Sequence, residues 1–175
     1  YHEMCGMTWG IVGLGNIGRK VAAVAAALGC RVIANKRTPV PDFECVDIDE
    51  LCRRADIISV HTPLTEGTRG LISAERIAMM KKNAIVINVA RGAVCDEAAL
   101  CAAVADGRIG AIGVDVYSKE PFGTDSPYAA VAGLPNVLLT PHMAWGSLEA
   151  RNRCIAEIAE NIKSYAGGGS RSRIV

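Results

Sequence analysis

Three side chains that could hold and protonate a small acid come after apolar runs of the sequence. Arg91 follows Ile87–Ala90, His142 follows Asn136–Pro141, and Glu120 lies in the connection between these runs. A guanidinium grips a carboxylate through two parallel hydrogen bonds, and an imidazole exchanges a proton near neutral pH. A carboxylate beside an imidazole favours its protonated form. These residue types therefore fit proton transfer on an anionic substrate.

Each of these residues also has a plainer interpretation. An isolated arginine is often a surface or helix-capping residue, and a lone histidine is often structural. The functional interpretation is favoured because Arg91, Asp115 and His142 each follow a predicted strand. In an open parallel sheet, ligands bind beyond the carboxyl ends of the strands. His61 ends another apolar run, and we expect it to be part of a cofactor-site wall rather than a catalyst.

A glycine-rich segment stands between the first predicted strand and the first predicted helix. Its sequence is Gly13-Leu14-Gly15-Asn16-Ile17-Gly18, the GxGxxG pattern of dinucleotide-binding turns. The first glycine permits the tight turn, the second lets the backbone approach a pyrophosphate, and the third lets the helix pack closely on the strand. The free N–H groups of the helix N-terminus favour phosphate there.

The end of the second predicted strand indicates which dinucleotide would bind. An acidic residue is expected about 20 residues past the glycines, where it bonds the adenosine ribose. The segment here is Asn35-Lys36-Arg37-Thr38, and no carboxylate follows until Asp42. A basic cluster can neutralise a 2′-phosphate, so we expect NADP to be favoured over NAD. The alternative is a solvated basic turn with the ribose bound in another way.

Apolar runs and helical patterns alternate along the chain. Strands are expected at Thr8–Val12, Arg31–Ala34, Ile57–Val60, Ala84–Val89, Ile109–Asp115 and Asn136–Thr140. Helices are expected at Asn16–Leu28, Ile48–Arg54, Ser73–Met80, Asp96–Asp106 and Ser147–Ala166, with N-caps at Ser73, Asp96 and Ser147. This order predicts an α/β fold of Rossmann type, a doubly wound parallel sheet of about six strands with helices on both faces.

Composition restricts the class of protein. At 175 residues, the chain fits one dinucleotide-binding domain over residues 1–175. The formal net charge of +1, without a basic block, argues against nucleic acid as a partner. No apolar run approaches the ~18 residues of a membrane span, so no membrane partner is expected. Seven cysteines without a CxxC pair indicate reduced thiols in a cytoplasmic protein, not disulfides or a metal site.

Taken in order, these motifs resemble the coenzyme-binding domain of the D-isomer-specific 2-hydroxyacid dehydrogenases. The matching blocks are Gly10–Gly18, His61–Thr65 with Thr68–Gly70, Asn88–Gly92, Gly113–Val116 with Glu120–Pro121, and Thr140–His142. They cover nearly the whole chain, from Met7 to about Tyr165. One block alone would be a weak signal, whereas the ordered set is highly specific.

The resemblance implies reversible hydride transfer between NAD(P)H and C2 of a small 2-oxo acid. Arg91 would orient the acid, His142 would be the acid/base, and Glu120 would pair with His142. Protonated His142 would donate to the developing alkoxide in reduction, and neutral His142 would take the hydroxyl proton in oxidation. Asp115 would bond the nicotinamide amide. The predicted cofactor site also includes Asn16 and Ile17 at the pyrophosphate, with Asn35, Thr38, His61, Thr62, Pro63, Thr68, Val89, Ala90, Arg91, His142 and Ala144.

The sequence departs from the family pattern in two ways. Lys36 stands where the family has an acid, which puts NAD specificity in doubt. The family's substrate domain is built largely from about 100 residues ahead of the glycine motif, and they are absent from this chain. Because loops of that domain complete the carboxylate site opposite Arg91, we expect the isolated chain to bind cofactor but to turn over poorly.

Other functions of the same fold stay open. A tryptophan at position 145, after Pro141-His142-Met143-Ala144, resembles the sequence of the glycerate dehydrogenase and hydroxypyruvate/glyoxylate reductase branch. Trp145 could equally be a packing residue. The C-terminal-binding-protein corepressors are similar but act mainly through protein partners, so a non-catalytic NAD(H)-sensing module is the alternative. Formate dehydrogenases pair their histidine with a glutamine, and Glu120 argues against them. Family members commonly form homodimers through this domain, which makes a homodimer the expected assembly.

Overall fold

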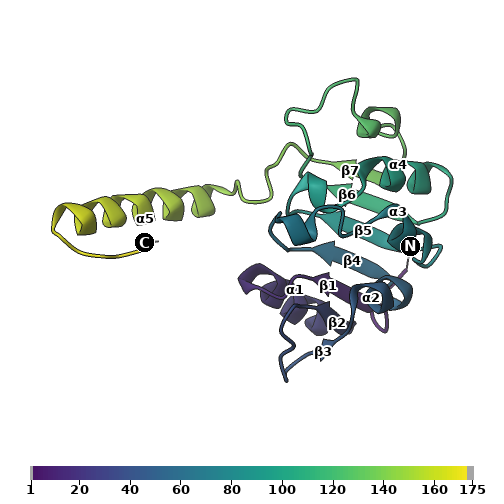
Figure 1. Cartoon of the computed structure of the whole chain (residues 1–175), viewed down its shortest axis with the longest axis horizontal. Helices are drawn as coiled ribbons and strands as arrows, with labels where there is room; N and C mark the ends of the chain where they lie inside the picture. The colour runs from purple at the N-terminus through teal and green to yellow at the C-terminus, as the bar shows by residue number, and fades with distance from the viewer. Residues whose placement is uncertain (1, 173–175) are drawn as a thin grey trace. The chain divides into compact units, whose positions relative to one another are not determined.

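The computed structural model describes residues 2–172, and its centre is one parallel sheet of seven strands (Figure 1). The strand order is β3-β2-β1-β4-β5-β6-β7. The strands are β1 (Thr8–Val12), β2 (Arg31–Asn35), β3 (Glu44–Cys45), β4 (Ile57–Val60), β5 (Ile85–Asn88), β6 (Ala111–Val114) and β7 (Val137–Leu139). The predicted α/β fold is confirmed. The count of six strands is corrected to seven, because the two-residue edge strand β3 pairs with β2.

The α-helices lie in the segments where the sequence predicted them. They are α1 (Asn16–Ala27), α2 (Ile48–Arg54), α3 (Ala74–Ala78), α4 (Glu97–Ala105) and α5 (Leu148–Ala166), with 3₁₀ turns η1 (Glu66–Thr68), η2 (Gly92–Val94) and η3 (Pro127–Ala130). The side chains of Ser73, Asp96 and Ser147 accept hydrogen bonds from the first turns of α3, α4 and α5. Each satisfies a helix-end N–H, so the three predicted N-caps are confirmed.

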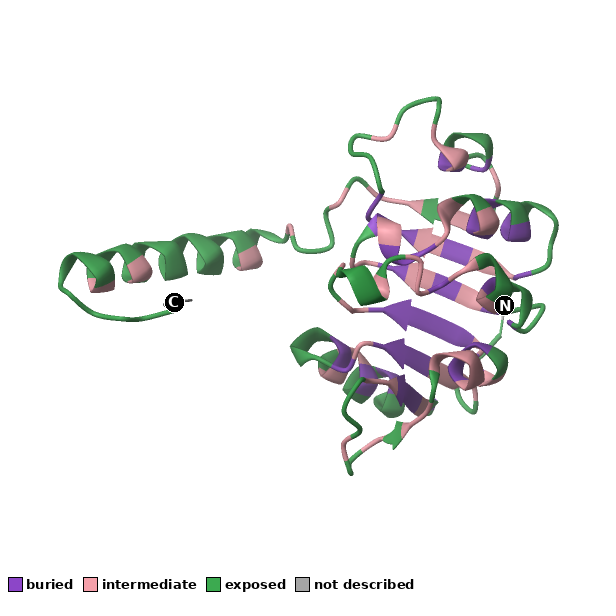
Figure 2. Cartoon of the chain, in the orientation of Figure 1, coloured by how far each residue is buried: buried purple, intermediate pink, exposed green. Residues whose placement is uncertain are grey.

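Consecutive residues of β1 show how helices cover both faces of the sheet. A Cβ at Gly10 would lie 2.7 Å from Cδ2 of Leu51 in α2, whereas a Cβ at Gly18 in α1 would approach the side chain of Ile11. Because successive strand residues point to opposite faces, α1 and α2 pack on opposite sides. Strands β1 and β4 are largely buried as a result (Figure 2).

The two faces carry two hydrophobic cores. The larger core joins α2, α3 and α4 to the sheet and includes Leu51, Ile58, Ile77, Val86 and Leu100. The smaller core, under α1, contains Ile11, Leu14, Ala22 and Ala34. With both faces occupied along β1 and β4, these strands consist of apolar runs rather than of alternating residues.

The chain comprises two units, residues 1–141 and 142–175, and the second contains α5. The helix α5 has no buried residue, and Leu148, Ile155, Ile158 and Ile162 are exposed on it. Arg171 and Glu157 form an ion pair of 2.7 Å within this unit. None of the helices over residues 2–172 combines the length and the apolar character that crossing a membrane requires. All seven cysteines are free thiols, as predicted.

Candidate functional site

The glycine turn after β1 is constrained at two of its three glycines. Gly13 has a φ of +96°, and a Cβ there would lie 2.8 Å from the backbone nitrogen of Thr62. A Cβ at Gly18 would lie 2.2 Å from the carbonyl oxygen of Gly13. No side chain larger than hydrogen fits at either position without displacing backbone. These contacts hold the turn and the first residues of α1 against β1 and the β4 end.

Gly15 differs from its two neighbours in the motif. A Cβ at Gly15 would meet no atom within 4 Å, and φ is −85°. Gly15 is the N-cap of α1, and no side chain caps the helix there. The first N–H groups of α1 therefore end at an open space that a ligand can fill, and a helix N-terminus favours an anion.

That space is part of a groove of about 510 Å³, within the size range of ligand sites. The groove runs from the glycine turn to the end of β2 and the loop that follows β4. Its lining residues are Val12, Gly13, Leu14, Gly15, Asn35, Lys36, Arg37, Thr62, Pro63, Thr65, Gly67, Thr68 and Leu71. Eight predicted cofactor-site residues thus share one cavity: Gly13, Gly15, Asn35, Lys36, Arg37, Thr62, Pro63 and Thr68.

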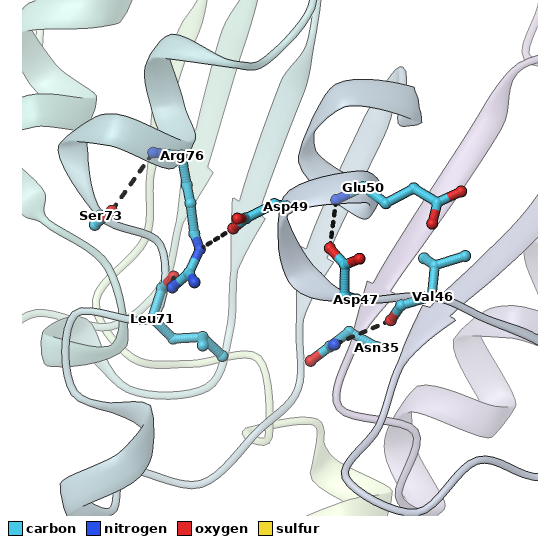
Figure 3. Close-up of polar contacts among 8 residues, drawn as sticks. All are labelled: Asn35, Val46, Asp47, Asp49, Glu50, Leu71, Ser73 and Arg76. Carbon is cyan, nitrogen blue, oxygen red and sulfur yellow. Dashed lines mark hydrogen bonds and ion pairs between the residues drawn. The ribbon is translucent and has the colours of Figure 1, made fainter.

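The end of β2 brings positive charge to the groove. Lys36 is half-buried and Arg37 is exposed, and neither forms an ion pair with a carboxylate within residues 2–172. The side-chain amide of Asn35 donates to the carbonyl of Val46 at 3.1 Å (Figure 3), which fixes the strand end. The basic groups at this end of the groove are thus available to an anionic ligand.

The opposite wall is a loop held by its own hydrogen bonds. The hydroxyl of Thr68 donates to the carbonyl of Pro63 at 2.6 Å and accepts from the N–H of Thr65 at 2.7 Å. Leu71 completes this wall. Arg76 supports it by donating to the Leu71 carbonyl at 2.9 Å and pairing with Asp49 of α2 at 2.7 Å (Figure 3). The wall is thereby tied to two helices.

Five further residues line the groove and were not among the predicted site residues: Val12, Leu14, Thr65, Gly67 and Leu71. The reciprocal side-chain and backbone bonds of Thr65 and Thr68 form a capping box around η1. The Thr-x-x-Thr spacing could have indicated Thr65, and the His61–Thr65 and Thr68–Gly70 blocks had already indicated Thr62, Pro63 and Thr68.

His61 lies beside the groove rather than in its lining. Its Nε2 is 3.0 Å from Oγ of Ser59, which accepts from the indole N–H of Trp9 at 2.8 Å. The backbone of His61 abuts Gly13. Burial lowers the pKa of His61, so the imidazole is neutral near pH 7. This environment suits a structural side chain behind the glycine turn.

A second group of predicted residues gathers at the carboxyl ends of β5 and β6. Asn88 is fully buried, and its side chain accepts from the N–H of Ala90 and donates to the carbonyl of Arg91, each at 3.0 Å. The guanidinium of Arg91 is exposed and donates to the carbonyl of Ala90 at 2.6 Å. Asn88 thus folds the turn that presents Arg91 to solvent.

Asp115 and Glu120 follow β6. Asp115 is buried, its backbone N–H donates to the carbonyl of Asn88 at 3.0 Å, and its carboxylate accepts from the hydroxyl of Thr140. Glu120 is exposed, and its carboxylate accepts from the backbone N–H of Tyr117 at 2.9 Å. Arg91, Asp115 and Glu120 therefore all lie at strand ends or in the connection beyond them, as predicted.

His142 is the first residue of the second unit. Its φ is 52°, a conformation that non-glycine residues seldom adopt and that is concentrated at functional sites. The indole N–H of Trp145 donates to the carbonyl of His142 at 2.9 Å. Trp145 itself is 60% exposed. His142 and Ala144 belong to this unit, whereas the other predicted site residues belong to the first.

The predicted cofactor residues of the first unit outside the groove lining are Asn16, Ile17, Gly18, Thr38, His61, Val89, Ala90, Arg91 and Asp115.

Comparison with known proteins gives one consistent result. The family described as "D-isomer specific 2-hydroxyacid dehydrogenase, NAD binding domain" matches residues 1–144. The glycerate dehydrogenase of Methylorubrum extorquens is 40% identical over 167 residues, which cover 95% of this chain and 52% of that protein. The chain thus spans about half the length of this relative.

Solved structures agree with this result. D-lactate dehydrogenase from Lactobacillus jensenii with NAD⁺ has a TM-score of 0.91 and 32% identity, covering 99% of this chain and 57% of that one. An acyclic imino acid reductase in complex with NADPH and D-Arg has a TM-score of 0.85 and 38% identity, covering 95% and 53%. Of these two similar chains, one therefore binds NAD⁺ and the other binds NADPH.

Proposed function

Because the chain belongs to the D-isomer specific 2-hydroxyacid dehydrogenases, as their NAD-binding domain, we propose that it is the cofactor-binding half of an oxidoreductase. The reaction is the interconversion of a small 2-oxo acid and the corresponding D-2-hydroxy acid. The observation that carries this proposal is the shared groove, in which the glycine turn, the β2 end and the Thr62–Thr68 loop surround one cavity. The relatives are dehydrogenases and reductases, which favours this function over a non-catalytic sensor.

The groove fits a nicotinamide dinucleotide. Gly13 and Gly18 leave no room for a Cβ, whereas Gly15 borders open space at the N-terminus of α1. The pyrophosphate would lie at this terminus, beside Gly15, Asn16 and Ile17. When bound, the nicotinamide supplies the hydride for reduction or accepts it for oxidation.

The protein's own residues bind the acid and move the proton. Arg91 binds the substrate carboxylate with its exposed guanidinium. His142 gives its proton to the oxygen on C2 during reduction and takes it back during oxidation. Glu120 stabilises the protonated imidazole, and Asp115 holds the carboxamide end of the cofactor.

The finer assignment within this function is a preference for NADP. Lys36 and Arg37 line the groove without carboxylate partners among the described residues. Two cations at the end of β2 attract a 2′-phosphate, whereas an acid at this position would bond the ribose hydroxyls of NAD. The similar acyclic imino acid reductase binds NADPH, which supports this preference.

Hydroxypyruvate, the 2-oxo acid that corresponds to glycerate, is the first substrate to test, because the chain is 40% identical to a glycerate dehydrogenase and Trp145 presents an exposed indole. We further propose that a substrate domain outside this chain completes the carboxylate site opposite Arg91, and that the assembly is a homodimer.

The test of this function is the oxidation of NADPH by the complete protein with hydroxypyruvate, glyoxylate, pyruvate or phosphohydroxypyruvate. Turnover with one of them, lost in His142→Ala and in Arg91→Ala, would support the proposal. Turnover with none of them would overturn the enzymatic function, and an unchanged rate in His142→Ala would overturn the acid/base assignment.

A further inference from the structure

Tyr117 touches two of the segments on which the proposed chemistry depends. Its backbone N–H donates to the carboxylate of Glu120 at 2.9 Å. Its hydroxyl lies 2.8 Å from the carbonyl oxygen of Thr140 and 3.3 Å from that of Val114. Because the hydroxyl has one proton, the shorter distance assigns the hydrogen bond to Thr140, two residues before His142 in the chain.

The ring of Tyr117 is held by two other aromatic rings. Its centroid is 4.5 Å from that of Phe122, and 5.4 Å from that of Tyr128 in an edge-on arrangement at 79°. Tyr117 is 7% exposed and Tyr128 is fully buried. Because tilted and edge-on aromatic pairs fix ring orientation, the hydroxyl of Tyr117 has a defined direction.

The hydroxyl is also a permanent donor. Burial raises the pKa of Tyr117, and the nearby carboxylates of Asp115 and Glu120 raise it further. The Glu97 carboxylate acts in the same direction. A phenol in these surroundings stays protonated over the pH range in which an imidazole titrates, so its bond to Thr140 persists.

The backbone of Tyr117 rests directly on the turn that carries Arg91. A Cβ at Gly92 would lie 2.2 Å from the carbonyl carbon of Tyr117. In addition, the N–H of Ser118 donates to the carboxylate of Glu97 in α4 at 2.8 Å. The segment from Tyr117 to Glu120 is therefore packed against the Arg91 turn and pinned to a helix.

From this arrangement we infer that Tyr117 is a positioning residue, which fixes the positions of the Glu120 carboxylate and the Thr140 carbonyl relative to each other. The inference rests on the proposed roles of Glu120 and His142. Tyr117 acts on the reaction through these residues. Without its hydroxyl, the ring and the backbone N–H that bonds Glu120 are both less constrained, so proton transfer slows while binding of the cofactor is unchanged.

Tyr117→Phe deletes this hydroxyl and keeps the ring. Tyr128→Phe is the matched control, because it removes a buried hydroxyl from the adjacent ring, and that hydroxyl has no hydrogen-bond partner within residues 2–172. The first readout is hydrogen exchange of the amide at position 117 in the ¹⁵N-labelled chain. We expect exchange to be faster by about fivefold in Tyr117→Phe, the factor for one hydrogen bond, and unchanged in Tyr128→Phe.

The second readout is turnover of the complete protein with NADPH and hydroxypyruvate. We expect kcat to fall by about fivefold in Tyr117→Phe at unchanged cofactor Kd and substrate KM, with Tyr128→Phe at the wild-type rate. Unchanged amide exchange in Tyr117→Phe overturns the inference, as does faster exchange at an unchanged kcat. If the wild type oxidises no NADPH, the proposed function fails, and the exchange result alone then decides whether Tyr117 constrains Glu120.

Discussion

The side-chain amide of Asn88 donates to the carbonyl of Arg91 at 3.0 Å, and the same side chain accepts from the N–H of Ala90. Asn88 is fully buried at the end of β5. One polar side chain therefore satisfies two backbone groups and sets the direction in which the Arg91 turn leaves the sheet.

Replacement of Asn88 should therefore destabilise the first unit. Asn88→Ala leaves the N–H of Ala90 and the carbonyl of Arg91 without these bonds, and we expect a loss of about 2 kcal/mol in the free energy of unfolding. Urea denaturation measures it. A loss below about 0.5 kcal/mol, the range of ordinary surface substitutions, would contradict the importance of this bridge.

Gly18 should not tolerate alanine, whereas a glycine in open space should. Gly18→Ala places a Cβ 2.2 Å from the Gly13 carbonyl, and we expect it to destabilise the chain by about 2 kcal/mol or more through overpacking. Gly133→Ala is the control, because its Cβ would meet no atom within 4 Å. Thermal or urea unfolding compares the two. Equal stabilities would show that α1 does not pack against β1 as described.

The cofactor preference should depend on the cations at the end of β2. We expect Lys36→Ala and Arg37→Ala each to weaken NADPH binding by about tenfold and to change NADH binding by less than about twofold. Fluorescence titration with both cofactors measures this ratio. Arg53→Ala removes an exposed cation outside the groove and serves as the control for net charge. An equal loss for both cofactors would argue against recognition of a 2′-phosphate.

Stability should depend on pH through Asp56. Burial opposes its ionisation, but hydrogen bonds from Lys81 and from the N–H of Thr8, each of 2.8 Å, lower its pKa below the ordinary value of 3.8. The carboxylate therefore contributes stability that is complete above that value and is lost as the pH falls through the lower folded-state pKa. Asp56→Asn should flatten this part of the stability profile. A profile that keeps the wild-type slope would contradict this role.

The sequence was most informative where strands are buried on both faces. Thr8–Val12 and Ile57–Val60 have the bounds that their apolar runs predicted, because helices cover both sides of them. The two-residue strand β3 was missed. It is a sheet edge with one half-buried and one exposed residue, so neither apolar run nor alternation marks it.

Site residues could be predicted where they belong to a motif with a chemical reason. The glycine turn and Lys36 were identified in this way, whereas Leu71 and Thr65 were not. Those two residues reach the groove because the Thr68 hydroxyl bonds the Pro63 carbonyl and Arg76 bonds the Leu71 carbonyl, and the periodicity of a helix or a strand predicts neither contact. Tyr117 was missed because its hydroxyl bonds the carbonyl of Thr140, 23 residues away, a tertiary contact that no local spacing indicates.

In the proposed function, the space beside Gly15 holds the pyrophosphate of a nicotinamide dinucleotide. The most direct measurement compares NADPH binding, followed by nicotinamide fluorescence, in the wild type, in Gly15→Val and in Gly133→Val. Both glycines leave free space around an added Cβ and have no positive φ, so both variants should fold. We predict that the wild type and Gly133→Val bind NADPH with similar affinity and that Gly15→Val does not bind it. Unchanged binding by Gly15→Val, in a chain with the wild-type melting temperature, would contradict the claim.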